Sequence, residues 1–321
     1  MSTTSELEAT APKVSLEQED GLCFHHNIPR GMVHRAAISE VFLTDSHRTP
    51  TGVAVAAQLP RNHAYFSDHR GTATNYDSLL LVEVFRQVAI YYAHEYRGVS
   101  TDRKFVFSAA EYGILEPASL RIGSAPGHCV IMAEPVQEKT RGDELVGLTL
   151  QMTAFVDGVE AARETMQYQW MPKDAWAKVR SRTRTALGLP ETYALPAPSL
   201  RARLRPEAVG RTNPRNSILA EPAYDERGRF VALALVDTDH PSLFDHALDH
   251  VPGMLQCLHR SRTTTRLVSL TTPVTLTMPV PMPRPTALPP VTTTGAARSR
   301  TPTRPGRPRP QPTALTVPSR A

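Results

Sequence analysis

The sequence predicts an α+β fold in which one buried helix is wrapped by a curled antiparallel sheet, and it predicts two copies of that unit. Three observations support this fold class: a helix at 77–96 that is apolar on nearly every side, strand-like segments before and after it, and a restart of the same motifs beyond residue 206. A helix that is apolar all round is buried all round, and a curled sheet is the simplest structure that covers it. The chain has 321 residues, 40% of them hydrophobic, and is long enough for two such units.

The first unit begins with two strands and the helix. Strands are expected at 40–45 and 52–58, because both segments are β-rich and bounded by turn residues. The helix at 77–96 follows, and either Asp77 or Ser78 is expected to be its N-cap.

Four more strands complete the first unit. The last two are expected to form a hairpin, because they meet at Asp157-Gly158 and this dipeptide favours the two-residue turn that suits twisted strands. The four expected strands are 104–115, 129–137, 144–156 and 160–170.

Composition divides the chain into five parts. Four prolines, Pro190, Pro196, Pro198 and Pro206, break any regular element between the two units. The C-terminal part is rich in Arg, Pro and Thr, and such a segment buries too little apolar area to offset its chain entropy. The expected parts are a disordered leader at 1–25, a first repeat at 26–178, a linker at 179–206, a partial second repeat at 207–255 and a disordered tail at 256–321.

The formal net charge of +5 resides in the tail. Beyond Asp249 the chain has ten Arg and no Asp, Glu or Lys, so the residues before it carry a net negative charge. That balance argues against a nucleic-acid groove. The sequence has no apolar run of membrane-spanning length, no secretion signal, and no G-x-S-x-G, P-loop or G-x-G-x-x-G motif. We expect a cytoplasmic protein without a membrane or nucleic-acid partner and without a cofactor.

The second half of the chain repeats motifs of the first half in the same order. VHR at 33–35 corresponds to VGR at 209–211, and EVFL at 40–43 corresponds to NSIL at 216–219. Further on, PRNHAYF at 60–66 corresponds to DHPSLF at 239–244. This order of correspondences indicates an internal duplication.

These motifs, together with DSLLLVEVFRQ at 77–87 and HALDHVPGM at 246–254, resemble those of the A-factor biosynthesis (AfsA-type) proteins over about residues 32–254. The resemblance implies a tandem hotdog fold and a part in γ-butyrolactone signal synthesis, a branch of secondary metabolism in actinomycetes. It implies an acyltransferase that moves a β-ketoacyl group from acyl carrier protein to the hydroxyl of dihydroxyacetone phosphate. The HPSLFDH and VPGM segments are also similar to a motif of hotdog dehydratases that act on acyl carrier protein.

Glu83, Arg86 and Gln87 are the main candidate site residues, because they share one face of an otherwise apolar helix. The implied reaction needs a base for the hydroxyl and a donor for the thioester oxyanion. Under the resemblance, Glu83 is the base, Arg86 binds the phosphate or the oxyanion, and Gln87 orients either group. The alternative is a structural ion pair between Glu83 and Arg86, since buried charges are costly unless paired.

Four residues outside the helix are secondary candidates. His63 is expected to be either an acid–base group or a loop histidine, and His240 resembles the dehydratase histidine and is a candidate substrate contact. Arg35 and Arg211 occupy equivalent repeat positions, either as phosphate contacts or as strand ends. The His and Asp residues at 240–250 lack zinc-like spacing, so no metal is expected.

The second repeat departs from the family pattern after residue 254. In the family it continues into its own buried helix with a Glu and an Arg, whereas residues 254–261 here read MLQCLHRS. We therefore expect a truncated or frameshifted second repeat, with a natural extension as the alternative. Besides the acyltransferase, two other functions remain open: a non-catalytic acyl- or lactone-binding or inactive homologue, and a hotdog dehydratase or thioesterase.

Overall fold

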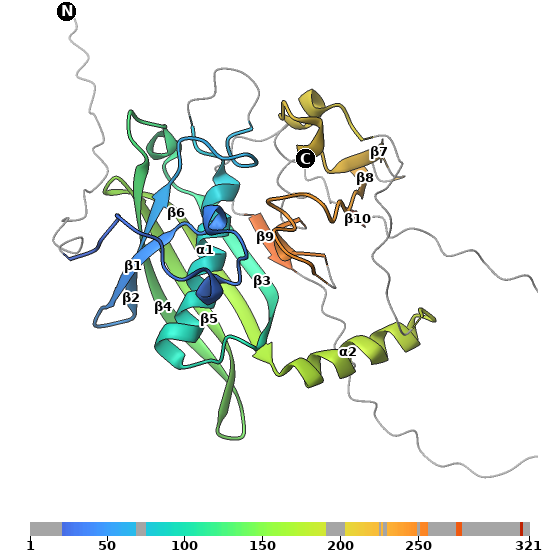
Figure 1. The fold of residues 1–321 in the computed structure, drawn as a ribbon, viewed down its shortest axis with the longest axis horizontal. Coiled ribbons are helices and arrows are strands. Elements are labelled where there is room, and N and C mark those ends of the chain that lie inside the picture. Colours follow the sequence, from blue (N-terminus) through green and yellow to red (C-terminus); the bar gives the residue numbers. More distant parts are fainter. Residues whose placement is uncertain are drawn as a thin grey trace, which may run out of the picture.

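The computed structural model describes residues 21–68, 75–190, 203–224, 226, 230–248, 251–255, 274–277 and 315–316. In this part of the chain one long helix, α1, lies against a seven-stranded antiparallel sheet with the strand order β1-β2-β4-β5-β6-β3-β9 (Figure 1). A second sheet has the order β10-β8-β7. The expected α+β architecture is confirmed. The main elements are β1 (Leu43–Arg48), β2 (Val53–Leu59), α1 (Ser78–Tyr91), β3 (Lys104–Ile114), β4 (Gly127–Arg141), β5 (Glu144–Val156), β6 (Val159–Met171), α2 (Lys173–Ala186), β7 (Leu219–Tyr224), β8 (Phe230–Ala234), β9 (Val274–Thr277) and β10 (Leu315–Thr316).

Short helical turns connect these elements. The 3-10 turns are η2 (Arg30–Val33), η3 (Ile38–Glu40), η5 (Pro117–Leu120), η6 (Pro206–Val209) and η7 (Pro214–Asn216). A π-helical turn, η4 (Tyr92–Tyr96), extends α1, so the helix predicted at 77–96 changes its geometry at Tyr92.

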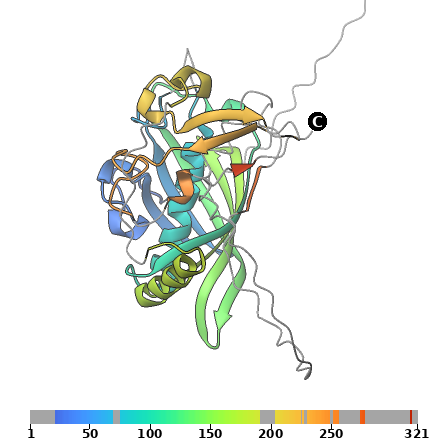
Figure 2. The same cartoon turned by 90° about the vertical axis from the view of Figure 1, so that its right-hand side faces the viewer.

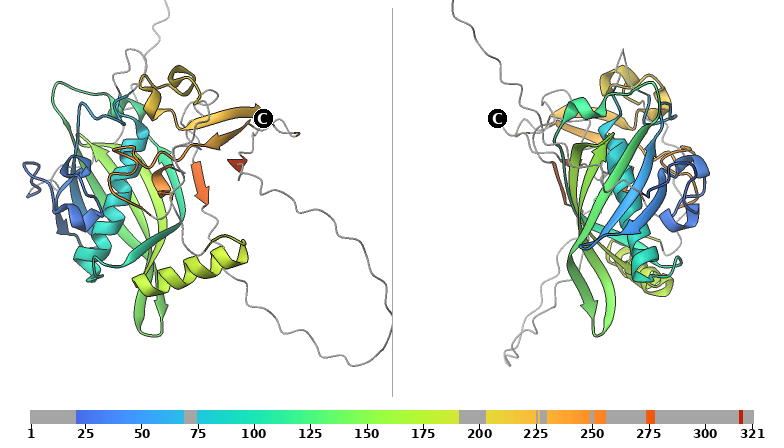
Figure 3. Two further views of the ribbon diagram at one scale, coloured as in Figure 1. Left: turned by 45° about the vertical axis from the view of Figure 1, so that its right-hand side comes forward. Right: turned by 90° about the vertical axis from the view of Figure 1, so that its left-hand side faces the viewer.

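The strands of the first half follow the predicted order with shifted ends. The first strand starts at Leu43 rather than at residue 40, because Ile38–Glu40 forms the turn η3. The hairpin between β5 and β6 is confirmed, and Asp157 and Gly158 have φ angles of 47° and 77°, as the expected turn requires. The hairpin of β4 and β5 continues past the end of the other strands, as both views in Figure 3 show.

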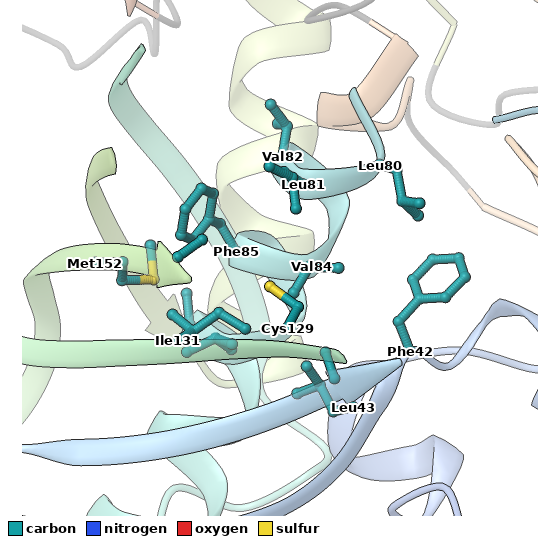
Figure 4. Packing of buried hydrophobic residues seen from close by; sticks show 14 of the residues in the cluster. Phe42, Leu43, Leu80, Leu81, Val82, Val84, Phe85, Cys129, Ile131 and Met152 are labelled. Carbon is teal, nitrogen blue, oxygen red and sulfur yellow. The ribbon is translucent and has the colours of Figure 1, made fainter. Parts of the chain in front are cut away.

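The helix α1 is buried on nearly every side, as its sequence predicts. All of its residues except Ser78 and Arg86 are buried, and the side chain of Asp77 caps it by accepting a hydrogen bond from the Leu79 N–H. Figure 4 shows Phe85 facing Ile131 and Met152 across the core. Burying a side chain such as Phe85 contributes about 2 kcal/mol or more, so the sheet holds the helix firmly.

The second half repeats the local geometry of the beginning of the first half. A left-handed residue ends η2 and η6, namely His34 and Gly210. The hairpin of β7 and β8, coloured yellow to orange, lies beside the β1–β6 sheet in Figure 2. Backbone hydrogen bonds also recur: Ile28 N–H to Leu43 O is matched by Leu204 N–H to Leu219 O, and Gln58 N–H to Phe42 O by Leu235 N–H to Ile218 O.

Two segments expected to lack regular structure, the linker and the tail, contain a helix and short strands. Helix α2 begins before the expected linker at 179–206 and continues into it to Ala186, and none of its residues is buried. Residues 191–202 of the linker lie outside the described residues. In the expected tail, β9 pairs with β3 and β10 pairs with β8. The rest of the tail, and the leader up to residue 20, lie outside the described residues.

Candidate active site

Glu83 is the centre of a buried polar cluster on α1. Its side chain has no exposed area, and its Oε1 atom lies 2.6 Å from Nη2 of Arg35 and 2.7 Å from Nη2 of Arg86. Its Oε2 atom accepts a second hydrogen bond from Nε of Arg86 at 2.8 Å. Two guanidinium groups, one on the same helix and one after η2, therefore hold the carboxylate.

Gln87 fixes the carboxylate from the next turn of the helix. Its Nε2 donates to Oε1 of Glu83 and to the backbone oxygen of Glu40, both at 2.7 Å. Its Oε1 accepts from the Phe42 N–H at 3.0 Å. Because Gln87 is fully buried, these contacts hold Glu83 in place and join α1 to the chain before β1.

The two arginines keep Glu83 ionised. Burial alone would raise the pKa of Glu83, but the charges and hydrogen bonds of Arg35 and Arg86 outweigh burial and lower the pKa to about 2. Glu83 in turn raises the pKa of Arg35, although burial opposes that shift. Glu83 and Arg35 are therefore both charged at neutral pH.

Asp245 joins this cluster from the second half of the chain. Its Oδ2 accepts hydrogen bonds from the backbone N–H groups of Ala36 at 2.8 Å and Ala37 at 3.4 Å, directly after Arg35. Nη1 of Arg35 lies 3.5 Å from Oδ1 of Asp245 and donates to the backbone oxygen of Ser242. The second half thus positions Arg35, which was predicted only as a phosphate contact or a strand end.

We call the contacts of Asp245 with the backbone after Arg35 a clamp. An equivalent clamp occurs around Arg211, with the two halves of the chain exchanged. Asp68 accepts hydrogen bonds from the backbone N–H groups of Thr212 and Asn213, directly after Arg211. The Arg211 guanidinium donates to the backbone oxygen of Tyr65, as Arg35 donates to that of Ser242. Each half of the chain therefore closes a loop of the other half.

Arg211 differs from Arg35 in its carboxylate partner. Arg211 is fully buried, pairs with Asp77 at 2.7 Å, and lies over the ring of Tyr65. Among the described residues, its Nε atom has no hydrogen-bond partner, whereas Nε of Arg35 donates to Glu83 at 3.2 Å. The structure does not bring Arg211 to the Glu83 cluster.

His63 and His240 occupy equivalent positions and make equivalent contacts. Nδ1 of His63 accepts from the Tyr65 and Phe66 N–H groups, and Nδ1 of His240 accepts from the Ser242 and Leu243 N–H groups, all at 3.2 Å.

The other ring nitrogens of these histidines also have partners. Nε2 of His63 lies 3.4 Å from Oε1 of Glu40, and Nε2 of His240 lies 2.9 Å from Oδ1 of Asn216. Both rings therefore organise loops, and the structure places neither in the Glu83 cluster. Burial lowers the pKa of His240 to about 4, so its ring is neutral at physiological pH.

Sequence reasoning missed the two clamping aspartates. Asp68 and Asp245 each follow the aligned histidine, His63 or His240, at the same spacing, and this signal was present in the repeat alignment. Asp245 was noted only as part of a crowded acidic and histidine segment. Its partners are backbone groups of the other half, which local sequence does not identify.

The open side of the cluster carries positive charge. The side chain of Arg86 is 15% exposed and that of Arg35 is 9% exposed, while Glu83 between them is covered. Arg86 uses Nε and Nη2 on Glu83, and no described residue forms a hydrogen bond with its Nη1. The site is suited to an anionic group such as a phosphate, which guanidinium groups bind through several hydrogen bonds.

No group of three or more His, Cys, Asp or Glu in the described part of the chain is arranged to hold a metal ion. In the same residues, no helix is long and apolar enough to cross a membrane. Cys129 is fully buried in the core among apolar side chains, where burial raises the pKa of its thiol.

Comparison with known proteins identifies the family. Residues 16–172 and 195–257 match the family model described as the A-factor biosynthesis hotdog domain. The chain is similar to "2-oxo-3-(phosphooxy)propyl 3-oxoalkanoate synthase" of Streptomyces virginiae, with 33% identity over 71% of this chain and 72% of the relative. It is also similar to the protein of that name in Streptomyces coelicolor, with 27% identity over 77% of this chain and 74% of the relative.

Solved structures include more distant matches. A protein from Alicyclobacillus acidocaldarius, described as a conserved protein of unknown function with a hot dog fold, is 12% identical with a TM-score of 0.31. The match covers 67% of this chain and 66% of that protein.

Proposed function

This chain belongs to the A-factor biosynthesis hotdog family, and we propose that it catalyses the acyl transfer for which its relatives are named. The product in that name is an ester between a 3-oxoalkanoyl group and a hydroxyl of dihydroxyacetone phosphate. We propose a β-ketoacyl group on acyl carrier protein as the donor and dihydroxyacetone phosphate as the acceptor.

The paired guanidinium groups of Arg35 and Arg86 carry this proposal. The acceptor has a dianionic phosphate, and it needs a partly exposed positive site that also orients its hydroxyl. Nη1 of Arg86 has no hydrogen-bond partner among the described residues, and the Arg86 side chain is more exposed than that of Arg35, so we assign Arg86 to the phosphate. Arg35 lies on the other side of Glu83, where it supports the same anion or the thioester oxyanion.

The contacts of Glu83 favour a role in positioning the two arginines over the predicted role as a general base. A general base needs a lone pair within hydrogen-bond reach of the substrate hydroxyl. The Glu83 side chain has no exposed area, and its Oε1 already accepts from Arg35, Arg86 and Gln87. We propose that Glu83 sets the spacing and orientation of the two guanidinium groups, and that Gln87 orients Glu83.

The test is a product assay with the purified chain. Incubation with 3-oxoacyl carrier protein and dihydroxyacetone phosphate is expected to give a phosphorylated ester, detected by mass spectrometry. Free 3-oxo acid, released with or without the acceptor, would instead indicate a thioesterase. An enoyl product from 3-hydroxyacyl carrier protein would indicate a dehydratase. No product from any of these substrates would indicate a non-catalytic homologue.

Variants of the cluster separate positioning from binding. Glu83→Gln is expected to lower kcat and to raise KM for dihydroxyacetone phosphate, because both guanidinium groups lose their anchor. Full activity of a folded Glu83→Gln protein would remove Glu83 from the mechanism. The matched control is Glu138→Gln, which removes the partner of Arg97 in a more exposed ion pair and is expected to leave both kinetic constants unchanged.

A further inference from the structure

His34 has a backbone conformation that is costly for its residue type. It ends η2 with φ 54° and ψ 47°, in the left-handed region. The equivalent residue at the end of η6 is Gly210, with φ 67°, and glycine adopts this region without steric cost. Non-glycine residues in this region are found in turns, such as Asp157, and also at active sites, so the contacts of the His34 side chain decide which case applies.

The ring of His34 is held by a second histidine. Its Nε2 lies 3.0 Å from Nε2 of His94, which belongs to the π-helical turn η4. Nδ1 of His94 lies 2.6 Å from the backbone oxygen of Val99. Turns of this rare geometry are frequent at functional sites.

These two contacts determine which nitrogen of His34 carries the proton. A carbonyl oxygen only accepts, so Nδ1 of His94 carries its hydrogen and donates to Val99. Burial lowers the pKa of His94, so the ring is neutral and its Nε2 is an acceptor. Nε2 of His34 must then be the donor of the shared hydrogen bond, which leaves Nδ1 of His34 with a lone pair.

That lone pair lies in a positively charged surrounding. His34 is partly exposed, and no described residue forms a hydrogen bond with its Nδ1. Besides His94, the groups that act on it are Arg86 of α1, Lys104 of β3 and His246. Burial is the largest cause of a lowered pKa at His34, and the electrostatic effect of these groups adds to it. Together they lower the pKa of His34 to about 3 and keep the ring neutral at pH 7. A phosphate dianion bound at Arg86 offsets these charges and makes the nitrogen more basic.

We propose that His34 is a catalytic residue whose Nδ1 accepts the proton of the substrate hydroxyl, and that His94 is the positioning residue that keeps this nitrogen unprotonated. The step rests on the acyl transfer proposed above. The hydroxyl oxygen forms a bond to the thioester carbon as its proton moves to Nδ1, and the carbon–sulfur bond then breaks. The proton passes from Nδ1 to the leaving sulfur, so the carrier departs as a thiol and the ring returns to its neutral form.

The test uses His34→Gly, because Gly210 shows that glycine fits this backbone. We expect kcat for ester formation to fall by roughly 100-fold or more, with KM for dihydroxyacetone phosphate little changed. Added imidazole is expected to restore part of kcat by filling the space of the lost ring. The control is His128→Gly, whose exposed ring stacks on Phe24, and we expect it to keep the wild-type kcat. Unchanged kcat in His34→Gly, or a loss that imidazole does not restore, would overturn the proposal.

A second measurement keeps this inference separate from the proposed function. Ring-labelled histidine NMR of the wild-type protein is expected to show His34 protonated at Nε2 and bare at Nδ1, with Nδ1 shifting when dihydroxyacetone phosphate is added. A hydrogen on Nδ1, or no response to that ligand, would refute the assignment of His34. If the wild-type protein forms no ester, the proposed function fails. The NMR experiment then still tests whether His34 carries its proton on Nε2 and whether its Nδ1 responds to dihydroxyacetone phosphate.

Discussion

Replacing Glu83 with glutamine tests whether the cluster is held by charge. The substitution keeps the shape of the side chain but leaves Arg35 and Arg86 buried beside a neutral amide. In the wild-type protein, the pKa of Glu83 falls from the ordinary value of 4.5 to about 2 on folding. At ~1.4 kcal/mol for each unit of pKa, the charged form contributes about 3 kcal/mol at neutral pH. Removing one partner of a buried ion pair costs about the same, roughly 3–5 kcal/mol.

The pH dependence gives the sign of this effect. A carboxyl group whose pKa is lowered by folding stabilises the protein above its unfolded pKa of 4.5 and loses that contribution as pH falls towards 2. The difference in unfolding free energy between wild type and Glu83→Gln is therefore expected to shrink from about 3 kcal/mol at pH 7 to about half of that at pH 3.

Urea denaturation at several pH values measures that difference. Glu138→Gln is the control, since Glu138 and Arg97 are a more exposed pair and the expected loss is below about 1 kcal/mol. A loss of unfolding free energy in Glu83→Gln that is no larger than in this control, or that is the same at pH 7 and pH 3, would show that charge does not hold the cluster.

Four further outcomes are expected. Arg86→Lys should raise KM for dihydroxyacetone phosphate about 10-fold without a matching loss of stability, because lysine cannot reproduce the planar fork; an unchanged KM contradicts this. Asp245→Asn should lower the unfolding free energy by about 1–3 kcal/mol in denaturation experiments, and no change would contradict the clamp. A thiol reagent followed by mass spectrometry should modify Cys23 in the folded protein but not the buried Cys129, whereas equal rates would contradict the packing. Resequencing across the codons after Leu255 should reveal a shifted frame that encodes a helix with Glu and Arg, and a continuous frame without one refutes the expected frameshift.

The sequence predicted the elements that depend on local pattern. The apolar run of α1 indicated a helix buried on all sides, and the Asp157-Gly158 turn fixed the register of a hairpin. The pairing of Arg35 with Glu83 could not be predicted, because a guanidinium at the end of a short turn has no periodic signal that names its partner. The helix α2 was missed because it has no buried face from which a pattern could be read.

The catalytic proposal for His34 depends on information that sequence patterns do not hold. His34 was visible as the one difference between VHR and VGR, but its significance comes from the left-handed backbone that it shares with Gly210. Its protonation depends on His94 and Val99, which belong to another element. Residues far apart in the chain thus determine which ring nitrogen can act.

The two halves of the chain contribute unequally to the candidate site. Asp245 and the backbone oxygen of Ser242 hold Arg35 and the residues after it, so the cluster on α1 needs the second half at least as far as Asp245. In return, Arg211 closes the loop before α1 and pairs with its capping residue Asp77. These contacts all come from residues before 255, where the composition changes. Among the described residues of the second half, Ser242 and Asp245 hold Arg35, so the change of composition after residue 255 leaves the contacts of Arg35 with Glu83 and Asp245 in place.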